Sequence, residues 1–308
     1  MEDLELLVKK DLHFIGFLVN VDDSILKLRI GDGFSIDKKP QEEVMPFLQG
    51  LNSHYGVQSG FDILHFDPSG GPSGCYCLTN CFPEFIESTP QGGIVVPIAK
   101  LKEIRQPLIN KLRLLRLFKE GNILMQFLLF YHLEESIPSV AQIGSEYPLI
   151  DRTVFQLSDD EYTQAETFIK DTKIPFQQTF LQLAFDSFEV SYETHNRSLA
   201  FMSLMISMEA LFGGGSELKY RISRNAAVLL GKNEDESNKM FDDMKSLYDK
   251  RSGIAHGRQG RRITPEDVLG LRYYVRESIQ SIYKLDLDRE ALLSVLNKSG
   301  FGQSPLSK

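Results

Sequence analysis

NRSLAFMSLMISMEALFGGGSELKYRISRNAAVLLG, residues 196–231, decides the fold of the second half of this chain. Its first part, 196–212, is rich in apolar residues at helical spacing and stops at three consecutive glycines, which end a helix readily. A second helical pattern, 216–231, follows and ends at Gly231. Two adjacent helices with a short glycine-rich connection predict a helical bundle.

Further helix signals surround this stretch from about 158 to 297. Ser158 with Glu161 three residues later predicts a capping box, and Asn233 with Glu236 repeats the spacing. Other expected helices span 174–193, Thr264 to about Lys284, and 288–297, with Thr264 as N-cap and Pro265 at the first helical position. The final residues, 300–308, have the composition of a disordered tail.

The first half of the chain predicts mixed α and β structure. Strands rich in β-branched and aromatic residues are expected at 13–21, 24–30, 61–66, 75–82 and 122–133. A tight turn is expected at 31–33, a short helix at 41–51, and a longer helix beginning near Pro97 with a kink or break at Pro107. The chain is therefore predicted to be α+β, with a mixed α/β domain at 1–150 and an all-α bundle at 151–308.

Composition narrows the class of protein. The 308 residues are 42 % hydrophobic and 25 % charged, which is typical of a soluble globular protein. No apolar run is long enough for a transmembrane helix, and the N-terminus does not have the pattern of a signal peptide, so we expect a cytoplasmic protein. Residues 1–151 hold 13 basic and 20 acidic residues, a balance of −7, and 152–308 hold 21 and 22, a balance of −1. Any nucleic-acid site must therefore be a local patch.

The three cysteines, Cys75, Cys77 and Cys81, lie in one short stretch. Their odd number argues against a disulfide framework. A zinc site would need a fourth ligand, and only the scattered His54 or His65 could supply it. Ordinary strand cysteines are the favoured interpretation, and we expect no metal or other cofactor.

YDKRSGIAHGRQGRRI, residues 248–263, concentrates positive charge in an otherwise acidic protein. Arg251 and His256 have an R-x4-H spacing. On a regular helix five residues turn about 500°, so the two side chains would point about 140° apart. They can act together if the helix ends near Gly253, or if a second copy of the motif faces the first across a two-fold axis.

SLYDKRSGIAHG resembles the signature of HEPN domains, which are helical nucleotide-binding and ribonuclease domains with an R-x4–6-H motif. The stretch 208–231 is similar to the preceding helices of the ApeA-like HEPN group: Glu209 in a small apolar setting, a glycine-rich break, and an arginine-containing helix. The resemblance covers roughly residues 155–285. Ser252 stands where many HEPN sequences carry Asn or Asp.

The resemblance implies a metal-independent endoribonuclease, of a bacterial anti-phage defence or toxin type, that acts as a homodimer with a composite cleft. His256 would be the acid/base for attack by the ribose 2′-hydroxyl, and Arg251 would hold the phosphate. These residue types suit the chemistry, because histidine titrates near neutrality and arginine offers a charged planar fork to phosphate oxygens. Ser252 can still donate a hydrogen bond. The implied partners are RNA, a second copy, and a trigger molecule or antitoxin.

Neighbouring residues suggest how RNA would be held. Arg258, Arg261 and Arg262 could contact backbone phosphates, with a soluble loop as an equally weighted alternative. Arg221 and Arg224, on the preceding helix, either face the same cleft or only solvent. Glu209 could orient Arg251 or another arginine, because a buried carboxylate needs a partner. Tyr248 could stack on a base, although packing in the core is favoured.

Two other functions remain open. The first is a non-catalytic HEPN module that binds RNA, nucleotide or a protein partner, an alternative that Ser252 supports. The second is a helical dimerisation or scaffold domain in which the R-x4-H spacing is accidental. A role for the N-terminal half in sensing or restraint rests on family analogy alone.

Overall fold

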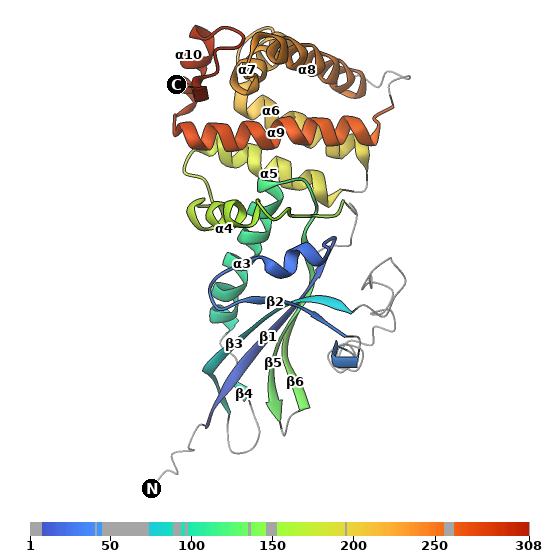
Figure 1. Cartoon of the computed structure of the whole chain (residues 1–308), viewed down its shortest axis with the longest axis vertical. Helices are drawn as coiled ribbons and strands as arrows, with labels where there is room; N and C mark the ends of the chain where they lie inside the picture. Colours follow the sequence, from blue (N-terminus) through green and yellow to red (C-terminus); the bar gives the residue numbers. More distant parts are fainter. Residues whose placement is uncertain are drawn as a thin grey trace. The chain divides into compact units, whose positions relative to one another are not determined.

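The computed structural model describes residues 8–40, 42–44, 74–88, 94–95, 98–134, 137–145, 153–194, 196–255 and 262–307. The chain divides into two compact units, coloured from blue to green and from yellow to red in Figure 1. Unit 1 comprises Met1–Arg116 and Glu120–Thr172, and unit 2 comprises Leu117–Lys119 and Lys173–Lys308. Unit 1 is built on a sheet and unit 2 is helical, so the predicted α+β class is confirmed.

An antiparallel sheet forms the centre of unit 1. Its strands follow the order β2-β3-β1-β5-β6, and β4 pairs with β3. Their bounds are β1 Val8–Val19, β2 Ser35–Lys39, β3 Cys75–Ser88, β4 Ile94–Val95, β5 Leu124–Glu134 and β6 Ile137–Ser145. The strands predicted at 13–21, 75–82 and 122–133 are thus confirmed as β1, β3 and β5.

The strand predicted at 24–30 is wrong. Asp23–Lys27 forms a 3-10 helix, η1, because the side chain of Asp22 accepts a hydrogen bond from the Ser24 N–H at 3.0 Å and starts the helical turn. The turn at 31–33 is confirmed, with positive φ at both glycines. The strand predicted at 61–66 lies outside the described residues, as does the helix predicted at 41–51 except for residues 42–44, which are helical.

The long helix of unit 1, α3 (Ile98–Phe118), begins just after Pro97 as predicted. It contains Pro107 without interruption, so the alternative of a break at this residue is wrong. Proline removes one helical hydrogen bond. The loss is offset here by an apolar face of buried leucines on both sides of the proline, Leu101, Leu108, Leu112 and Leu115.

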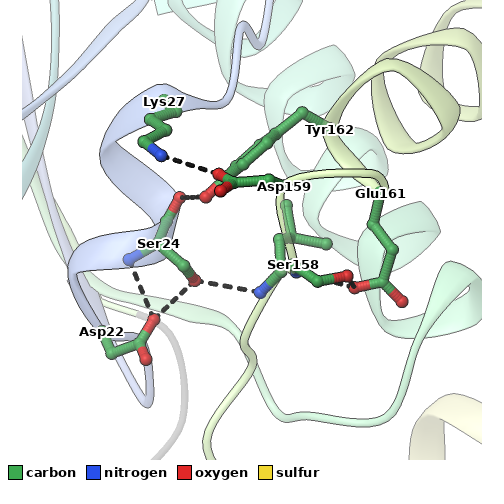
Figure 2. Close-up of polar contacts among 8 residues, drawn as sticks. Asp22, Ser24, Lys27, Ser158, Asp159, Glu161 and Tyr162 are labelled. Carbon is green, nitrogen blue, oxygen red and sulfur yellow. Dashed lines mark hydrogen bonds and ion pairs between the residues drawn. The ribbon is translucent and has the colours of Figure 1, made fainter.

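The part of unit 1 that follows the sheet contacts η1 through hydrogen bonds and an ion pair made by residues 157–162 (Figure 2). The Leu157 N–H donates to Ser24 Oγ at 2.9 Å, and the Tyr162 hydroxyl donates to the Ser24 carbonyl at 2.8 Å. Lys27 Nζ lies 2.7 Å from Asp159 Oδ1. These contacts explain why unit 1 extends to Thr172, whereas the sequence predicts a boundary near 150. We call this set of contacts, centred on Ser24, the latch.

The capping box predicted at Ser158 forms only in part. The backbone N–H and the hydroxyl of Ser158 both donate to Glu161 Oε2 at 2.8 Å. The helix itself, α4, spans Tyr162–Asp171 and therefore begins four residues after Ser158. The pair closes a turn that precedes the helix, in which the Glu161 N–H also donates to the Ser158 carbonyl at 3.0 Å.

Unit 2 consists of helices packed around apolar side chains. They are α5 Thr179–Glu193, α6 Arg197–Phe212, α7 Leu218–Leu230, α8 Glu234–Ala255, α9 Pro265–Leu285 and α10 Arg289–Lys298. Phe201, Leu204 and Met208 of α6 are fully buried, so this helix lies at the centre of the core. Ser207 Oγ donates to the Ala184 carbonyl at 2.8 Å and joins α6 to α5.

The predicted starts of α8 and α9 are confirmed by their caps. Glu236 N–H donates to Asn233 Oδ1 at 2.9 Å, directly before α8. Thr264 and Asp267 form a complete capping box with proline at the start of α9. The start predicted at 174 is wrong, because α5 begins at Thr179 and the Phe176 N–H donates to Gln182 Oε1 at 2.7 Å instead. The predicted disordered tail is wrong: Ser304 Oγ donates to the Leu229 carbonyl at 2.7 Å, and the Gly302 N–H donates to Ser237 Oγ at 3.0 Å. Long-range contacts that leave no local signal thus fix the C-terminus.

Candidate functional site

The motif arginine lies one turn before the end of α8. The helix continues through Gly253 to Ala255, two residues further, so Gly253 itself does not end it. Gly253 is buried in the helix with nothing within 4 Å of an added Cβ, and its φ is not positive. The glycine therefore imposes no turn. His256 is the first residue after α8 and lies outside the described residues, as do Arg258 and Arg261.

Arg251 is paired with the acid of α6. Its Nη2 lies 3.0 Å from Glu209 Oε1, and both side chains are about a quarter exposed, at 27 % and 25 %. The sequence leaves open whether Glu209 pairs with Arg251 or with another arginine, and in the structure it pairs with Arg251. Glu209 stands in the last turn of α6, where the helix dipole disfavours an acid. An acid at this position lowers the stability of the helix by itself, and the ion pair with Arg251 offsets this loss of stability.

Two atoms of this pair lack hydrogen bonds. Within the described part of the chain, Arg251 Nε and Glu209 Oε1 are both buried and make none. The close approach of Nη2 is therefore an ion-pair contact without good hydrogen-bond geometry. Buried polar atoms are almost always satisfied, and exceptions concentrate where a ligand, water or ion belongs. The cluster thus has the character of a binding site for a polar group.

Tyr248 completes the cluster. The Arg251 guanidinium carbon lies 5.6 Å from the centre of the Tyr248 ring, a cation–π distance. Partial burial raises the pKa of Tyr248, the charge of Glu209 raises it further, and Arg251 opposes both. The phenol consequently stays protonated at neutral pH and can donate a hydrogen bond. Tyr248 is half-buried at the cluster rather than deep in the core. We call Glu209, Tyr248 and Arg251 the arginine cluster.

The remaining predicted residues are distributed more widely. Ser252 follows Arg251 on α8 and is half-exposed, and Arg262 is exposed just before α9. Arg221 is exposed near the start of α7, where its guanidinium lies 3.7 Å from the position that a Cβ on Gly215 would take. The structure places Arg221 on α7, the helix that packs against α8.

Arg224 has a different role from the one predicted. Its Nη1 donates to the Leu296 carbonyl at 2.9 Å and its Nη2 donates to the Ser299 carbonyl at 2.7 Å. These carbonyls belong to the C-terminal end of α10, where a cation is favourable. The guanidinium is thus committed to holding α10 against α7, and we no longer assign Arg224 to an RNA-binding surface.

Two ion pairs that the sequence did not predict support the end of α8. Lys219 Nζ lies 2.7 Å from both carboxylate oxygens of Asp249, which joins α7 to α8. Lys250 pairs with Asp267 and joins α8 to the first turn of α9. Burial alone would raise the pKa of Asp267, but hydrogen bonds from Lys250 and Thr264 lower it overall. Each pair spans residues far apart in sequence, so local patterns could not have revealed them.

The described residues offer no metal site. They contain no group of three or more His, Cys, Asp or Glu side chains that could hold an ion. Cys75, Cys77 and Cys81 of β3 are free thiols, and His54 and His65 lie outside the described residues. Within the same part of the chain, no helix has the length and hydropathy needed to span a membrane.

Comparisons of the whole chain with protein-family models, curated proteins and solved structures find no match. The resemblance to HEPN domains therefore stays a prediction that rests on the motif stretches themselves. The arginine cluster is an independent geometric observation, because it comes from the contacts of α6 with α8 and not from the motif spacing.

Proposed function

We propose that this chain is a metal-independent endoribonuclease of the HEPN type that cleaves RNA by attack of a ribose 2′-hydroxyl. The observation that carries the proposal is the ion pair of Glu209 with Arg251, held one turn before His256. An anti-phage defence or toxin-type role follows from the same resemblance. The physical case for the site is that an arginine with an unsatisfied buried donor suits an incoming phosphate oxygen.

In the proposed reaction, His256 accepts the proton of the 2′-hydroxyl as its oxygen attacks the adjacent phosphorus. The bond from phosphorus to the 5′-oxygen breaks, and that oxygen takes up the proton that His256 accepted. The products are a 2′,3′-cyclic phosphate and a 5′-hydroxyl, so no water or metal enters this step. Arg251 stabilises the charge that develops on the phosphate oxygens, and Glu209 fixes the direction of its guanidinium.

A second copy of the chain is part of the proposal. Because α8 stays helical to Ala255, a helical continuation would point residue 256 about 140° away from Arg251. A two-fold arrangement would let Arg251 of one copy act with His256 of the other. Mixing the variants Arg251→Ala and His256→Ala tests this directly, since a mixed dimer can rebuild one intact pair.

The experiment for the proposed function is end-group analysis of RNA incubated with the protein. We expect 2′,3′-cyclic phosphate and 5′-hydroxyl ends from the wild type and from the mixture of the two inactive variants. Ends with a 3′-hydroxyl and a 5′-phosphate would contradict the proposed chemistry. Activity of the wild type without any recovery in the mixture would contradict the shared site and leave the chemistry standing.

The alternative is a non-catalytic module that binds RNA, a nucleotide or a protein partner. A specific observation favours it: Arg251 is already engaged by Glu209, so part of its guanidinium serves the protein and not a substrate. This alternative predicts binding that weakens with salt while the RNA remains intact.

A further inference from the structure

The face of α8 that leads to the arginine cluster carries a repeated aromatic–cation pattern. Lys245 Nζ lies 5.0 Å from the centre of the Phe241 ring, and the Arg251 guanidinium lies 5.6 Å from the centre of the Tyr248 ring. Phe241 and Tyr248 are seven residues apart, so they lie within about 20° of the same helix face and about 10 Å apart along the axis. All four side chains are partly exposed.

Tyr220 of α7 adds an exposed ring to this face. It meets Phe241 edge to face, with ring centres 5.8 Å apart and planes at 81°. Phe241 also contacts Phe301 of the C-terminal tail, with ring centres 5.7 Å apart. Phe241 is therefore packed against two rings, whereas Tyr220 remains 53 % exposed. An exposed tyrosine held by a packed ring offers a rigid surface for stacking.

Two acids near this face are paired with cations. Asp249 has both oxygens 2.7 Å from Lys219 Nζ, and Glu209 is paired with Arg251. Asp242, next to Phe241 in the chain, is one of the exposed acids near this face, with Glu217 and Glu234. Lys245 therefore contributes positive charge next to the rings, which favours a phosphate backbone at short range.

We propose that Tyr220, Phe241, Lys245, Tyr248 and Arg251, the aromatic–basic stripe, bind a single strand of RNA and deliver it to the arginine cluster. A base stacks on the exposed ring of Tyr220, and phosphates lie against Lys245 and Arg251. The strand must be single because, in a duplex, each internal base face is covered by its neighbours. This inference deepens the proposed function and rests on it for the identity of the ligand as RNA.

Tyr273 of α9 provides a matched contrast. It is 45 % exposed and also has an arginine near its ring, with the Arg276 guanidinium 6.0 Å from its centre. Its surroundings differ, because Glu277 and Glu236 lie near enough to act on its hydroxyl. Those acids repel phosphate, so Tyr273 should take no part in RNA binding.

The test is equilibrium binding of a labelled single-stranded RNA whose 2′-hydroxyls are methylated, so that cleavage cannot occur. Tyr220→Ala should weaken binding about 5- to 100-fold, the effect of losing one stacked base. Tyr220→Phe keeps the ring and should bind as the wild type does, and Tyr273→Ala should also leave binding unchanged. Asp242→Asn should tighten binding, and the duplex form of the same RNA should bind more weakly than the single strand.

The outcomes separate this inference from the proposed function. Equal affinity of Tyr220→Ala and wild type, or equal binding of duplex and single strand, overturns the aromatic–basic stripe even if the wild type cleaves unmodified RNA. Absence of any single-strand binding overturns it as well. Binding that depends on Tyr220, in a protein that never cleaves RNA, supports the stripe and overturns the ribonuclease.

Discussion

The latch of unit 1 and the arginine cluster of unit 2 are both polar, yet they differ in how fully their atoms are satisfied. In the latch, the Ser24 hydroxyl donates to Asp22 at 2.5 Å and accepts the Leu157 N–H at 2.9 Å (Figure 2). In the arginine cluster, Arg251 Nε and Glu209 Oε1 make no hydrogen bond within the described residues. A network that satisfies itself holds a fold together, whereas an incomplete one is suited to a ligand.

The largest expected effect is that of a substitution in the arginine cluster on the rate of RNA cleavage. Arg251→Lys keeps the positive charge beside Glu209 but loses the planar fork and the unsatisfied Nε. We expect the rate of RNA cleavage to fall by about 100-fold or more, a loss typical of removing a transition-state donor. Arg29→Lys, the same change at an exposed residue of unit 1, is the control and should leave the rate unchanged. Wild-type cleavage by Arg251→Lys would show that the fork has no role.

The next effect is on the stability of unit 1. Ser24→Ala leaves the Leu157 N–H without its acceptor and removes a donor to Asp22. We expect it to cost about 1–3 kcal/mol of unfolding free energy, measured by denaturant titration. Ser158→Ala removes an exposed hydroxyl near the same contacts and should cost less. Equal losses from the two variants would contradict the role assigned to Ser24.

A smaller effect on stability is expected from the ion pair of Lys250 with Asp267, which joins α8 to α9. This effect depends on pH. The folded-state pKa of Asp267 is lowered, so its carboxylate stabilises the fold above the unfolded pKa of about 3.9 and that contribution disappears as the pH falls through the folded value. Asp267→Asn should therefore be less stable than the wild type by about 1–2 kcal/mol at neutral pH. The difference should vanish in strong acid, and a pH-independent difference would contradict this account.

The smallest effect belongs to the exposed ion pair of the latch. The hydrogen bond between the two side chains raises the pKa of Lys27 and lowers that of Asp159, but both groups are exposed to solvent. Exposed pairs contribute little to stability. Lys27→Met should leave the unfolding midpoint of unit 1 unchanged within error. A clear loss would mean that the ion pair, and not the hydrogen bonds of Ser24, holds the latch.

Local patterns were sufficient for much of the fold. The caps at Asn233 and Thr264 involve residues three positions apart, so the sequence alone predicts where α8 and α9 begin. The same reasoning failed at 24–30, where β-branched and apolar residues favoured a strand but the Asp22 side chain closes a helical turn. It failed again at the C-terminal tail, whose order depends on Ser304 reaching Leu229, 75 positions away.

The candidate site was accessible from sequence only in part. Arg251 and Glu209 could be suspected because an acid in an apolar helix needs a cationic partner, and the structure joins them. Arg224 could not be assigned correctly, since the carbonyls that it binds lie more than 70 positions away. Tyr220 was missed because its contact with Phe241 exists only once α7 and α8 are packed together. Lys245 could have been suspected, because it lies four residues after Phe241 on the same helix.

Cleavage of total RNA and tRNA in EDTA, by the wild type beside His256→Ala, tests the central claim most directly. We predict that the wild type cleaves in the absence of divalent metal and that the variant is slower by about 10²- to 10⁴-fold, the usual contribution of a general acid/base. Thermal unfolding of both proteins should coincide, so that the loss reflects chemistry. Cleavage by His256→Ala at the wild-type rate, or wild-type cleavage that EDTA abolishes, would contradict the account.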